Sequence, residues 1–234
     1  MIVVSDDTLS RTDGAAVQNL INELASKTNL VNESEGWNGV NILHQDASRV
    51  GALDLGIVPR TSMAESAKLV FLLGADNFRH EDIPEDAFVI YMGTTGDEGV
   101  YYADLIIPTS SYLEKDATYV NMDGRVQRTR AALTPPGFAR DDWMVLRALS
   151  EELGTPLPYD SLDEVRTRLA ELAPHLVRYD TIEQGSFDRV ALLQGADRHL
   201  SSALLTDAVD NFYMTDPISR NSHIMARCTR ELNP

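Results

Sequence analysis

The sequence predicts an α/β fold in which a largely parallel sheet is covered by helices. The main evidence is three apolar runs, at residues 69–74, 88–93 and 104–108, that show almost no alternation of polar and apolar positions. Such runs are typical of strands buried on both faces of a parallel sheet. Two of the runs end in glycine and the third in proline. Helical periodicity precedes and follows them, which favours an α/β layer arrangement.

The N-terminal part begins with a short apolar run at residues 2–4, which indicates a buried strand. Residues 13–26 then carry apolar side chains at helical spacing, and Asp13 stands where a helix cap belongs. The apolar face of this predicted helix consists of Val17, Leu20, Ile21 and Leu24.

The next segment, residues 32–39, is polar and rich in turn residues, so it is expected to be a loop. A short apolar segment follows at residues 40–43, and after it a helix that ends near Gly56. The apolar positions of that helix are Ala47, Val50 and Leu53.

Beyond residue 115 the pattern changes to a hairpin and then to helices. The segments 117–121 and 125–130 flank Asp123 and Gly124, and this dipeptide favours a tight hairpin turn. The run Pro-Pro-Gly at residues 135–137 breaks the chain before the helical part begins.

Two helices are expected after this break. The first covers about residues 141–153, and Gly154 follows it at a position that often ends a helix. Ser161 and Glu164 form a capping box that starts the second, and Pro174 stops it. The side chains expected to be buried are Trp143, Leu146, Leu149 and Leu153 in the first helix and Val165, Leu169 and Leu172 in the second.

After residue 180 the periodicity weakens, which indicates an extended or helical tail. We therefore divide the chain into an α/β part at residues 1–134, a helical continuation at 135–180 and a C-terminal tail at 181–234. At 234 residues the chain is long enough to bury a sizeable core.

The charge balance narrows the classes of partner. Acidic residues outnumber basic ones 36 to 20, which gives a formal net charge of −16 at pH 7. Such a field repels phosphate backbones and anionic lipid headgroups, so we expect basic protein partners and no nucleic acid. No apolar run approaches the roughly 20 residues of a membrane-spanning helix, so no direct membrane insertion is expected.

The single cysteine, Cys228, cannot form an internal disulfide, a zinc site or an iron–sulfur site without other thiols. It indicates a reducing compartment, either the cytosol or the mitochondrial matrix. The first residues, an apolar strand followed by acidic side chains, are unlike a transit or signal peptide. We therefore expect either a protein made in the compartment where it works or a sequence that is not the primary translation product.

The glycine-rich stretch at residues 92–99 follows a predicted strand, as phosphate-binding loops do. One interpretation is a nucleotide or pterin-diphosphate loop, and the other is a set of tight turns. Asp97 and Glu98 would repel a phosphate, and the stretch holds no lysine or arginine. It matches neither the dinucleotide fingerprint nor the P-loop, so we favour tight turns.

The cluster Glu114, Lys115 and Asp116 suggests either a general acid–base group or a structural ion-pair network, and we favour the network. Ser110 and Ser111 lack the glycine-flanked setting of a nucleophilic serine.

No two histidines stand at the helical spacing of metal ligands, so no metal site is indicated. The histidines are His44, His80, His175, His199 and His223. Cys228 lies near Arg227 and Arg230, which suggests a reactive thiolate, but we favour an inert thiol on a terminal helix. We assign no catalytic, cofactor-binding or metal-ligating residue.

Longer motifs carry a family resemblance. Residues 103–129 (ADLIIPTSSYLEKDATYVNMDGRVQRT) and 135–143 (PPGFARDDW) resemble a late segment of the molybdopterin-oxidoreductase superfamily. Other stretches resemble the large iron–sulfur (seventy-five-kilodalton) subunits of mitochondrial respiratory complex I, NADH:ubiquinone oxidoreductase. They are residues 13–17, 41–56, 71–76, 92–99, 148–183 and 212–228.

The resemblance implies an incomplete molybdopterin-oxidoreductase-like fold. It also implies a non-catalytic structural role in the matrix arm of complex I, where clusters on other chains carry electrons from NADH to ubiquinone. The cysteine-rich region of the family is absent, so iron–sulfur clusters are expected on a separate chain that supplies the N-terminal half. Ala117 stands where active relatives often have glycine, and no molybdenum ligand can be assigned. The other expected partners are further matrix-arm subunits.

The implied location is the matrix side of the mitochondrial inner membrane, with the bacterial cytoplasm as the alternative. A split gene kept in the organelle would explain the missing transit peptide. Two other functions stay open at this point, namely a piece of an active molybdopterin oxidoreductase and a free-standing nucleotide-binding enzyme. Because half a fold exposes apolar surface, we predict that the isolated chain aggregates or is molten. A cooperative thermal transition of the lone chain would contradict this prediction.

Overall fold

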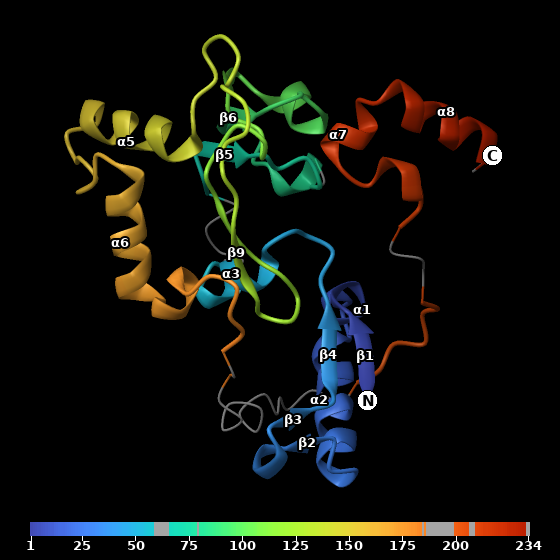
Figure 1. The fold of residues 1–234 in the computed structure, drawn as a ribbon. Helices are drawn as coiled ribbons and strands as arrows, with labels where there is room; N and C mark the ends of the chain where they lie inside the picture. The colour runs from blue at the N-terminus through green and yellow to red at the C-terminus, as the bar shows by residue number, and fades with distance from the viewer. Residues whose placement is uncertain (59–65, 79, 184, 186–198, 206–208, 233–234) are drawn as a thin grey trace. The chain divides into compact units, whose positions relative to one another are not determined.

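The computed structural model describes residues 1–58, 66–78, 80–183, 185, 199–205 and 209–232 (Figure 1). The chain forms two compact units, each built from three separate stretches. Unit 1 comprises Met1–Ile57, Tyr119–Gln127 and Leu169–Ala208, and unit 2 comprises Val58–Thr118, Arg128–Arg168 and Val209–Pro234.

Unit 1 contains a parallel pair of strands, β1 (Ile2–Ser5) and β4 (Val40–Leu43), with Ile2 opposite Val40. The strands lie where the two apolar segments were predicted, but the expected burial of residues 2–4 is wrong, since Val3 is 49% exposed. The helices α1 (Asp6–Ser10) and α2 (Gly14–Lys27) connect them. The segment expected to be a loop holds more structure than predicted. It contains β2 (Val31–Asn32), a 3-10 turn at Glu33–Glu35 and β3 (Trp37–Asn38), which pairs antiparallel with β2.

The helix α2 begins after Asp13 as predicted, but the Asp13 side chain does not cap it. Its carboxylate instead accepts hydrogen bonds from Arg11 Nε and from the N–H of Ser201, both at 2.9 Å. The Arg11 hydrogen bond, followed by that of Ser201, lowers the pKa of Asp13 below its ordinary value. The predicted apolar face is partly wrong, because Leu20 and Leu24 are half exposed.

The core of unit 1 lies around the predicted hairpin, whose strands are β8 (Thr118–Val120) and β9 (Val126–Arg128). Gly124 in the turn has a φ of 84°, which explains the glycine there. The helix α3 (Arg49–Asp54) contributes Val50 to this core. The buried members are Val120, Val126, Ala173 and Leu176, with Leu169 and Tyr179 packed beside them.

Gly51 of α3 is required by close packing, and we expect Gly51→Ala to destabilise unit 1 by about 1–3 kcal/mol. A Cβ at this position would lie 2.8 Å from Val120 Cγ2. Amide hydrogen exchange of β8 would measure the loss. Gly185→Ala is the matched control, because a Cβ there meets no atom of the described residues within 4 Å. Equal exchange rates in the two variants would contradict the packing argument.

Unit 2 is built on a parallel sheet in the order β5 (Leu69–Leu73), β6 (Phe88–Gly93), β7 (Leu105–Pro108). Leu69 pairs with Phe88, and Ile90 pairs with Leu105. The parallel pairing confirms the predicted α/β fold. Burial on both faces holds for the central strand β6, whose residues 89–92 are buried. It is wrong for the outer strands, whose half-exposed side chains include Leu69, Leu73, Leu105 and Ile106.

The predicted helices are α5 (Asp142–Glu152) and α6 (Leu162–Leu172). The capping box is confirmed, since Ser161 Oγ accepts from the N–H of Glu164, whose carboxylate accepts from the N–H of Ser161. Leu153 and Leu172 were expected inside and are instead exposed, because each lies at the end of its helix. Among the described residues, no helix is long and apolar enough to cross a bilayer.

Candidate functional site

The C-terminal segment, residues 209–232, folds back onto the glycine loop of unit 2, residues 92–99. The segment contains a 3-10 turn (Phe212–Met214) and the helices α7 (Pro217–Arg220) and α8 (His223–Leu232), drawn in red in Figure 1. Arg220 Nε donates to the carboxylate of Asp97, and Arg220 Nη2 donates to Asn77 Oδ1 at 3.2 Å. The side chains of Asp97 and Arg220 are 11% and 22% exposed, so this ion pair is largely shielded from water.

The local sequence positions Arg220. Asp216 caps α7 by accepting from the N–H groups of Ile218 and Ser219, and Pro217 fits the first helical turn. Asn221, directly after the helix, donates from Nδ2 to the carbonyl of Gly96 at 2.9 Å. Two consecutive residues of the segment therefore contact the loop, one through charge and one through a hydrogen bond.

The cap is expected to make the stability of α7 depend on pH. Hydrogen bonds from the Ser219 side chain, then from the backbone N–H groups, lower the pKa of Asp216 below 3.8. A lowered folded-state pKa means that the cap stabilises above pH 3.8 and is lost as the pH falls through the folded value. We expect the amide protection of α7 to decline with acidification over that window, by about 1 kcal/mol. Asp216→Asn should cap without titrating, so an unchanged decline in that variant would contradict this assignment.

The buried side chain of Asp76 makes a second contact with the glycine loop. Asp76 is buried, and its carboxylate accepts from Tyr91 Oη at 3.1 Å and from the N–H of Gly99 at 2.8 Å. Burial, then the charge of Asp76, raises the pKa of Tyr91 to about 12, so the phenol stays a neutral donor at physiological pH.

Two glycines of the loop are explained by Tyr91. A Cβ at Gly93 would lie 2.4 Å from Tyr91 Oη, and one at Gly99 would lie 2.5 Å from Tyr91 Cδ2. Gly96 has a φ of 68° and so supplies a turn. The glycines serve packing and turning, in line with the tight-turn interpretation.

The acidic–basic cluster does not converge on one point. Glu114 accepts from the N–H of Ser111, and Lys115 Nζ lies 2.8 Å from the carboxylate of Asp142. Asp116 pairs with Arg128 at 2.9 Å, and that hydrogen bond lowers the pKa of Asp116. The three side chains face three different partners. The cluster therefore ties the loop after β7 to neighbouring elements of unit 2.

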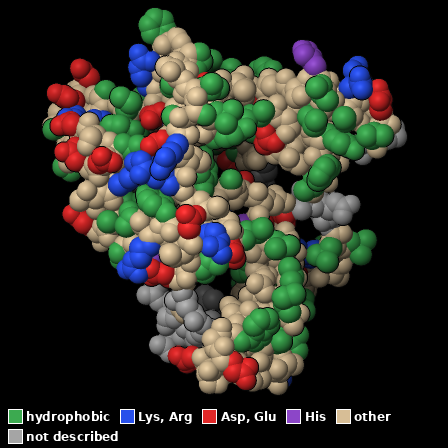
Figure 2. Space-filling view, in the orientation of Figure 1, with side chains coloured by type: hydrophobic (Ala, Val, Ile, Leu, Met, Phe, Trp, Pro, Cys, Tyr) green, Lys and Arg blue, Asp and Glu red, His purple; other side chains and the backbone are tan. Residues whose placement is uncertain are grey.

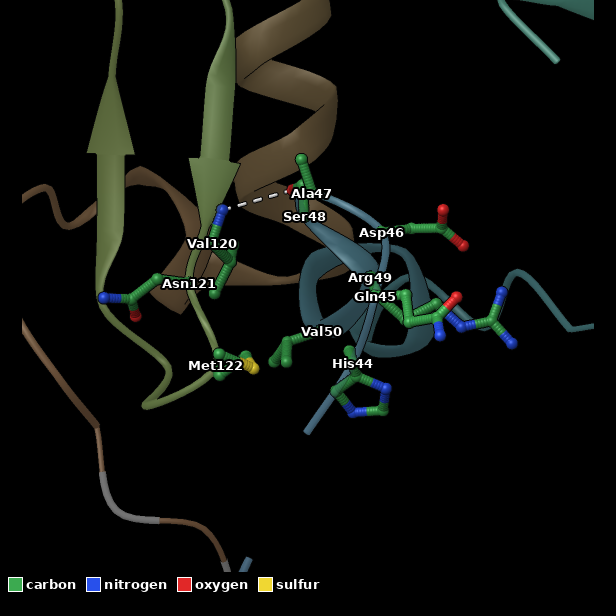
Figure 3. Close-up of a pocket in the computed structure, with 10 residues that line it drawn as sticks. All are labelled: His44, Gln45, Asp46, Ala47, Ser48, Arg49, Val50, Val120, Asn121 and Met122. Carbon is green, nitrogen blue, oxygen red and sulfur yellow. Dashed lines mark hydrogen bonds between the residues drawn. The ribbon is translucent and has the colours of Figure 1, made fainter. Parts of the chain in front are cut away.

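His44 lines a cavity of about 290 Å³ in unit 1, between residues 44–50 and the hairpin (Figure 3). Its apolar wall consists of Val50, Val120 and Met122, and Ser48 Oγ accepts from the N–H of Val120 at 3.1 Å. Figure 3 shows Asp46 and Arg49 pointing away from the hairpin. The cavity is therefore lined by both apolar and polar side chains, and His44 Nδ1 lies 3.3 Å from the carboxylate of Asp6.

The other predicted histidines have separate surroundings. His175 pairs with Asp54 at 2.8 Å, and His223 is exposed at the start of α8. His199 is also engaged in a polar, charged or ring interaction. The side chain of His80 lies outside the described part of the chain. The described residues include no group of three or more side chains suited to a metal ion.

Neither Ser110 nor Cys228 is an exposed nucleophile. Ser110 is 1% exposed, and its N–H donates to the carbonyl of Arg140, so its hydroxyl is out of reach of a substrate. Cys228 is half-buried on α8, and the neighbouring Arg227 pairs with Glu231 at 3.5 Å.

Comparison with known families decides the classification. Residues 1–152, which are more than half of the chain, match the family described as molybdopterin oxidoreductase. The chain belongs to the molybdopterin oxidoreductase family. Residues 181–228, including most of the C-terminal segment, match a second family, which describes the C-terminal region of an NADH-ubiquinone oxidoreductase subunit.

Individual relatives of this molybdopterin oxidoreductase family member align with nearly the whole chain. It is 48% identical to the NADH-ubiquinone oxidoreductase 78 kDa subunit of Candida albicans over 97% of its length, and 43% identical to that of Neurospora crassa over 98%. It is 41% identical to the NADH-ubiquinone oxidoreductase 75 kDa subunit of Reclinomonas americana over 98%. The chain spans only about a third of each relative. This partial coverage and the second family match together indicate that the chain corresponds to the C-terminal part of such a subunit.

The family name implies a molybdopterin group, whose phosphate would need cationic or amide donors. The glycine loop does not fit it. Asp76 already accepts from the Gly99 amide, and Arg220 already neutralises Asp97. Sequence reasoning identified the loop but missed Arg220 and Asp76. The only signal for Arg220 is its place within the 212–228 stretch that resembles complex I subunits.

Proposed function

We propose that this chain is a non-catalytic structural part of the matrix arm of respiratory complex I. In this role it supports electron transfer from NADH to ubiquinone that clusters on other chains carry. One observation carries the proposal. Nearly the whole chain aligns at 41–48% identity with proteins named as NADH-ubiquinone oxidoreductase subunits. The internal use of the candidate polar groups, above all Asp76, Asp97 and Arg220, supports a scaffolding role.

The proposal includes partners and a place in the cell. The iron–sulfur clusters belong to the part of the subunit that this sequence does not span, because the one cysteine here cannot hold them. Further matrix-arm subunits complete the surroundings. The location is the mitochondrion, in accordance with the relatives named as mitochondrial.

The test is to tag the chain, extract native membranes in mild detergent and size the tagged particle while assaying NADH oxidation. Co-migration with a very large NADH-oxidising particle that contains a cysteine-rich partner supports the proposal. A small species without NADH oxidation refutes it. Stoichiometric molybdenum or tungsten with the chain would instead establish an active molybdopterin oxidoreductase.

A further inference from the structure

We propose that the loop at residues 130–140 docks into an apolar pocket, rimmed by carboxylates, on another polypeptide of the NADH-oxidising particle. Phe138 enters the pocket, and Arg130 and Arg140 pair with its rim. The loop lies between β9 and α5 and belongs to unit 2. The inference rests on the proposed function, because the partner is sought in that particle.

The loop exposes apolar side chains that the fold of unit 2 does not cover. Phe138 is 89% exposed and Leu133 is 58% exposed. Residues 131–139 include no charged side chain. Figure 2 shows hydrophobic side chains next to Lys or Arg side chains at the tip of this loop, at the top of the view. Apolar groups gathered in this way beside polar ones are typical of a protein-binding surface.

Backbone hydrogen bonds hold the loop in shape from both ends. Near its start, the N–H of Ala132 donates to the carbonyl of Leu113 at 2.8 Å. Near its end, the N–H of Ala139 donates to the carbonyl of Pro136 at 3.0 Å, and Arg140 Nη1 donates to the carbonyl of Ala139 at 2.7 Å. Ala139 itself is buried. A loop held in this way loses little conformational freedom when its exposed ring binds, which favours affinity.

Two cations flank the apolar stretch, and neither pairs with a carboxylate of the described residues. Arg130 is exposed, and the exposed Arg140 donates to backbone carbonyls of its own loop. By contrast, Arg128 and Arg147 each form an ion pair. The next acidic residue along the chain, Asp141, lies at the start of α5, where the helix dipole favours a negative charge. The two loop cations are therefore complementary to carboxylates on a partner.

This chemistry favours a protein over the other possible occupants. Aromatic residues and arginine are enriched in the buried parts of protein interfaces. An anionic membrane is disfavoured, because the net charge of −16 is repelled by it and one ring buries too little apolar area for stable anchoring. A second copy of this chain is disfavoured, because two chains of that charge repel each other.

Photo-cross-linking in the native particle tests the docking. A benzophenone amino acid replaces Phe138, and in a control it replaces Tyr101, an aromatic residue of unit 2 that is 83% exposed. We expect the Phe138 probe to label one segment of another polypeptide, and the Tyr101 probe to leave that segment unlabelled. The inference is overturned if both probes label the same segment. It is also overturned if the Phe138 probe labels nothing, or labels only lipid, a second copy or the subunit that contains this chain, while the chain is present in the particle. Absence of the chain from the particle refutes the proposed function instead.

Zero-length coupling tests the carboxylate rim. Arg130→Lys keeps the charge and adds an amine, which a carbodiimide joins to a contacting carboxylate as an amide with loss of water. The unchanged chain is the control, because arginine does not couple, and it gives the background from Lys27, Lys68 and Lys115. We expect Arg130→Lys to couple to the segment that the Phe138 probe labels. Adding Phe138→Ala should lower this coupling at least about tenfold, because truncating an interface anchor weakens binding by that order. Coupling that is absent, or that Phe138→Ala leaves unchanged, overturns the inference.

Discussion

Replacing Tyr91 with alanine is expected to destabilise unit 2 by about 3–5 kcal/mol, the usual cost of truncating a buried aromatic residue. Tyr91 is 2% exposed and packs with Leu72 and Val89 in the core of the sheet. The loss is large beside a typical total stability of about 5–15 kcal/mol. Amide hydrogen exchange of β6, measured on the chain in its native complex, would measure the loss, because those amides open only when the sheet unfolds.

Tyr91→Phe separates packing from hydrogen bonding. It keeps the ring but removes the hydroxyl that donates to Asp76, while the Gly99 amide still donates. The expected cost is about 1–3 kcal/mol, the penalty for removing one partner of a buried polar group. If Tyr91→Phe were as damaging as Tyr91→Ala, the hydroxyl rather than the ring would hold the loop.

Replacing Arg220 with methionine is expected to release the C-terminal segment from the glycine loop. The change leaves the largely buried Asp97 carboxylate without its cation, which costs about 3–5 kcal/mol for a buried pair. Methionine keeps much of the apolar stem, so the loss reports the charge. Faster amide exchange in α7 and α8, together with new protease cleavage in the segment, would measure the release.

Arg227→Met is the matched control, because Arg227 and Glu231 are 70% and 63% exposed. Removing such a surface pair should change the stability by less than about 1 kcal/mol. Exchanging the charges, with Asp97→Arg and Arg220→Asp together, should recover part of the loss. If the Arg220 and Arg227 variants released the segment equally, loss of any arginine from it would be enough to release it, and the Asp97 contact would not be the cause.

The sequence predicted correctly those elements that are determined by residues close to one another along the chain. The apolar run of β6 and the capping box of Ser161 and Glu164 depend on residues within a few positions of one another, so the order of residues contains the information. The Arg220–Asp97 contact joins residues 123 positions apart, and no periodicity announces it. The loop itself could be singled out, but its cation could not.

The wrong predictions concern which helical side chains are buried. Periodicity identified the apolar side chains of α2 correctly, yet Leu20 and Leu24 are half exposed. A pattern reports which side chains favour burial and does not report whether a neighbour is present to cover them. The predicted burial of Leu172 is wrong for another reason, because Leu172 is the last residue of its helix.

The interleaved order of the two units has a consequence for biosynthesis. Unit 1 needs stretches that end at Ile57, Gln127 and Ala208, and unit 2 needs the final residues from Val209 onward. Neither unit has all three of its stretches while the ribosome is still translating the middle of the chain, so we expect apolar surfaces of the early elements to stay uncovered during that time. We therefore expect a chaperone to shield nascent β1 and β5 until the residues beyond Ala208 have been translated.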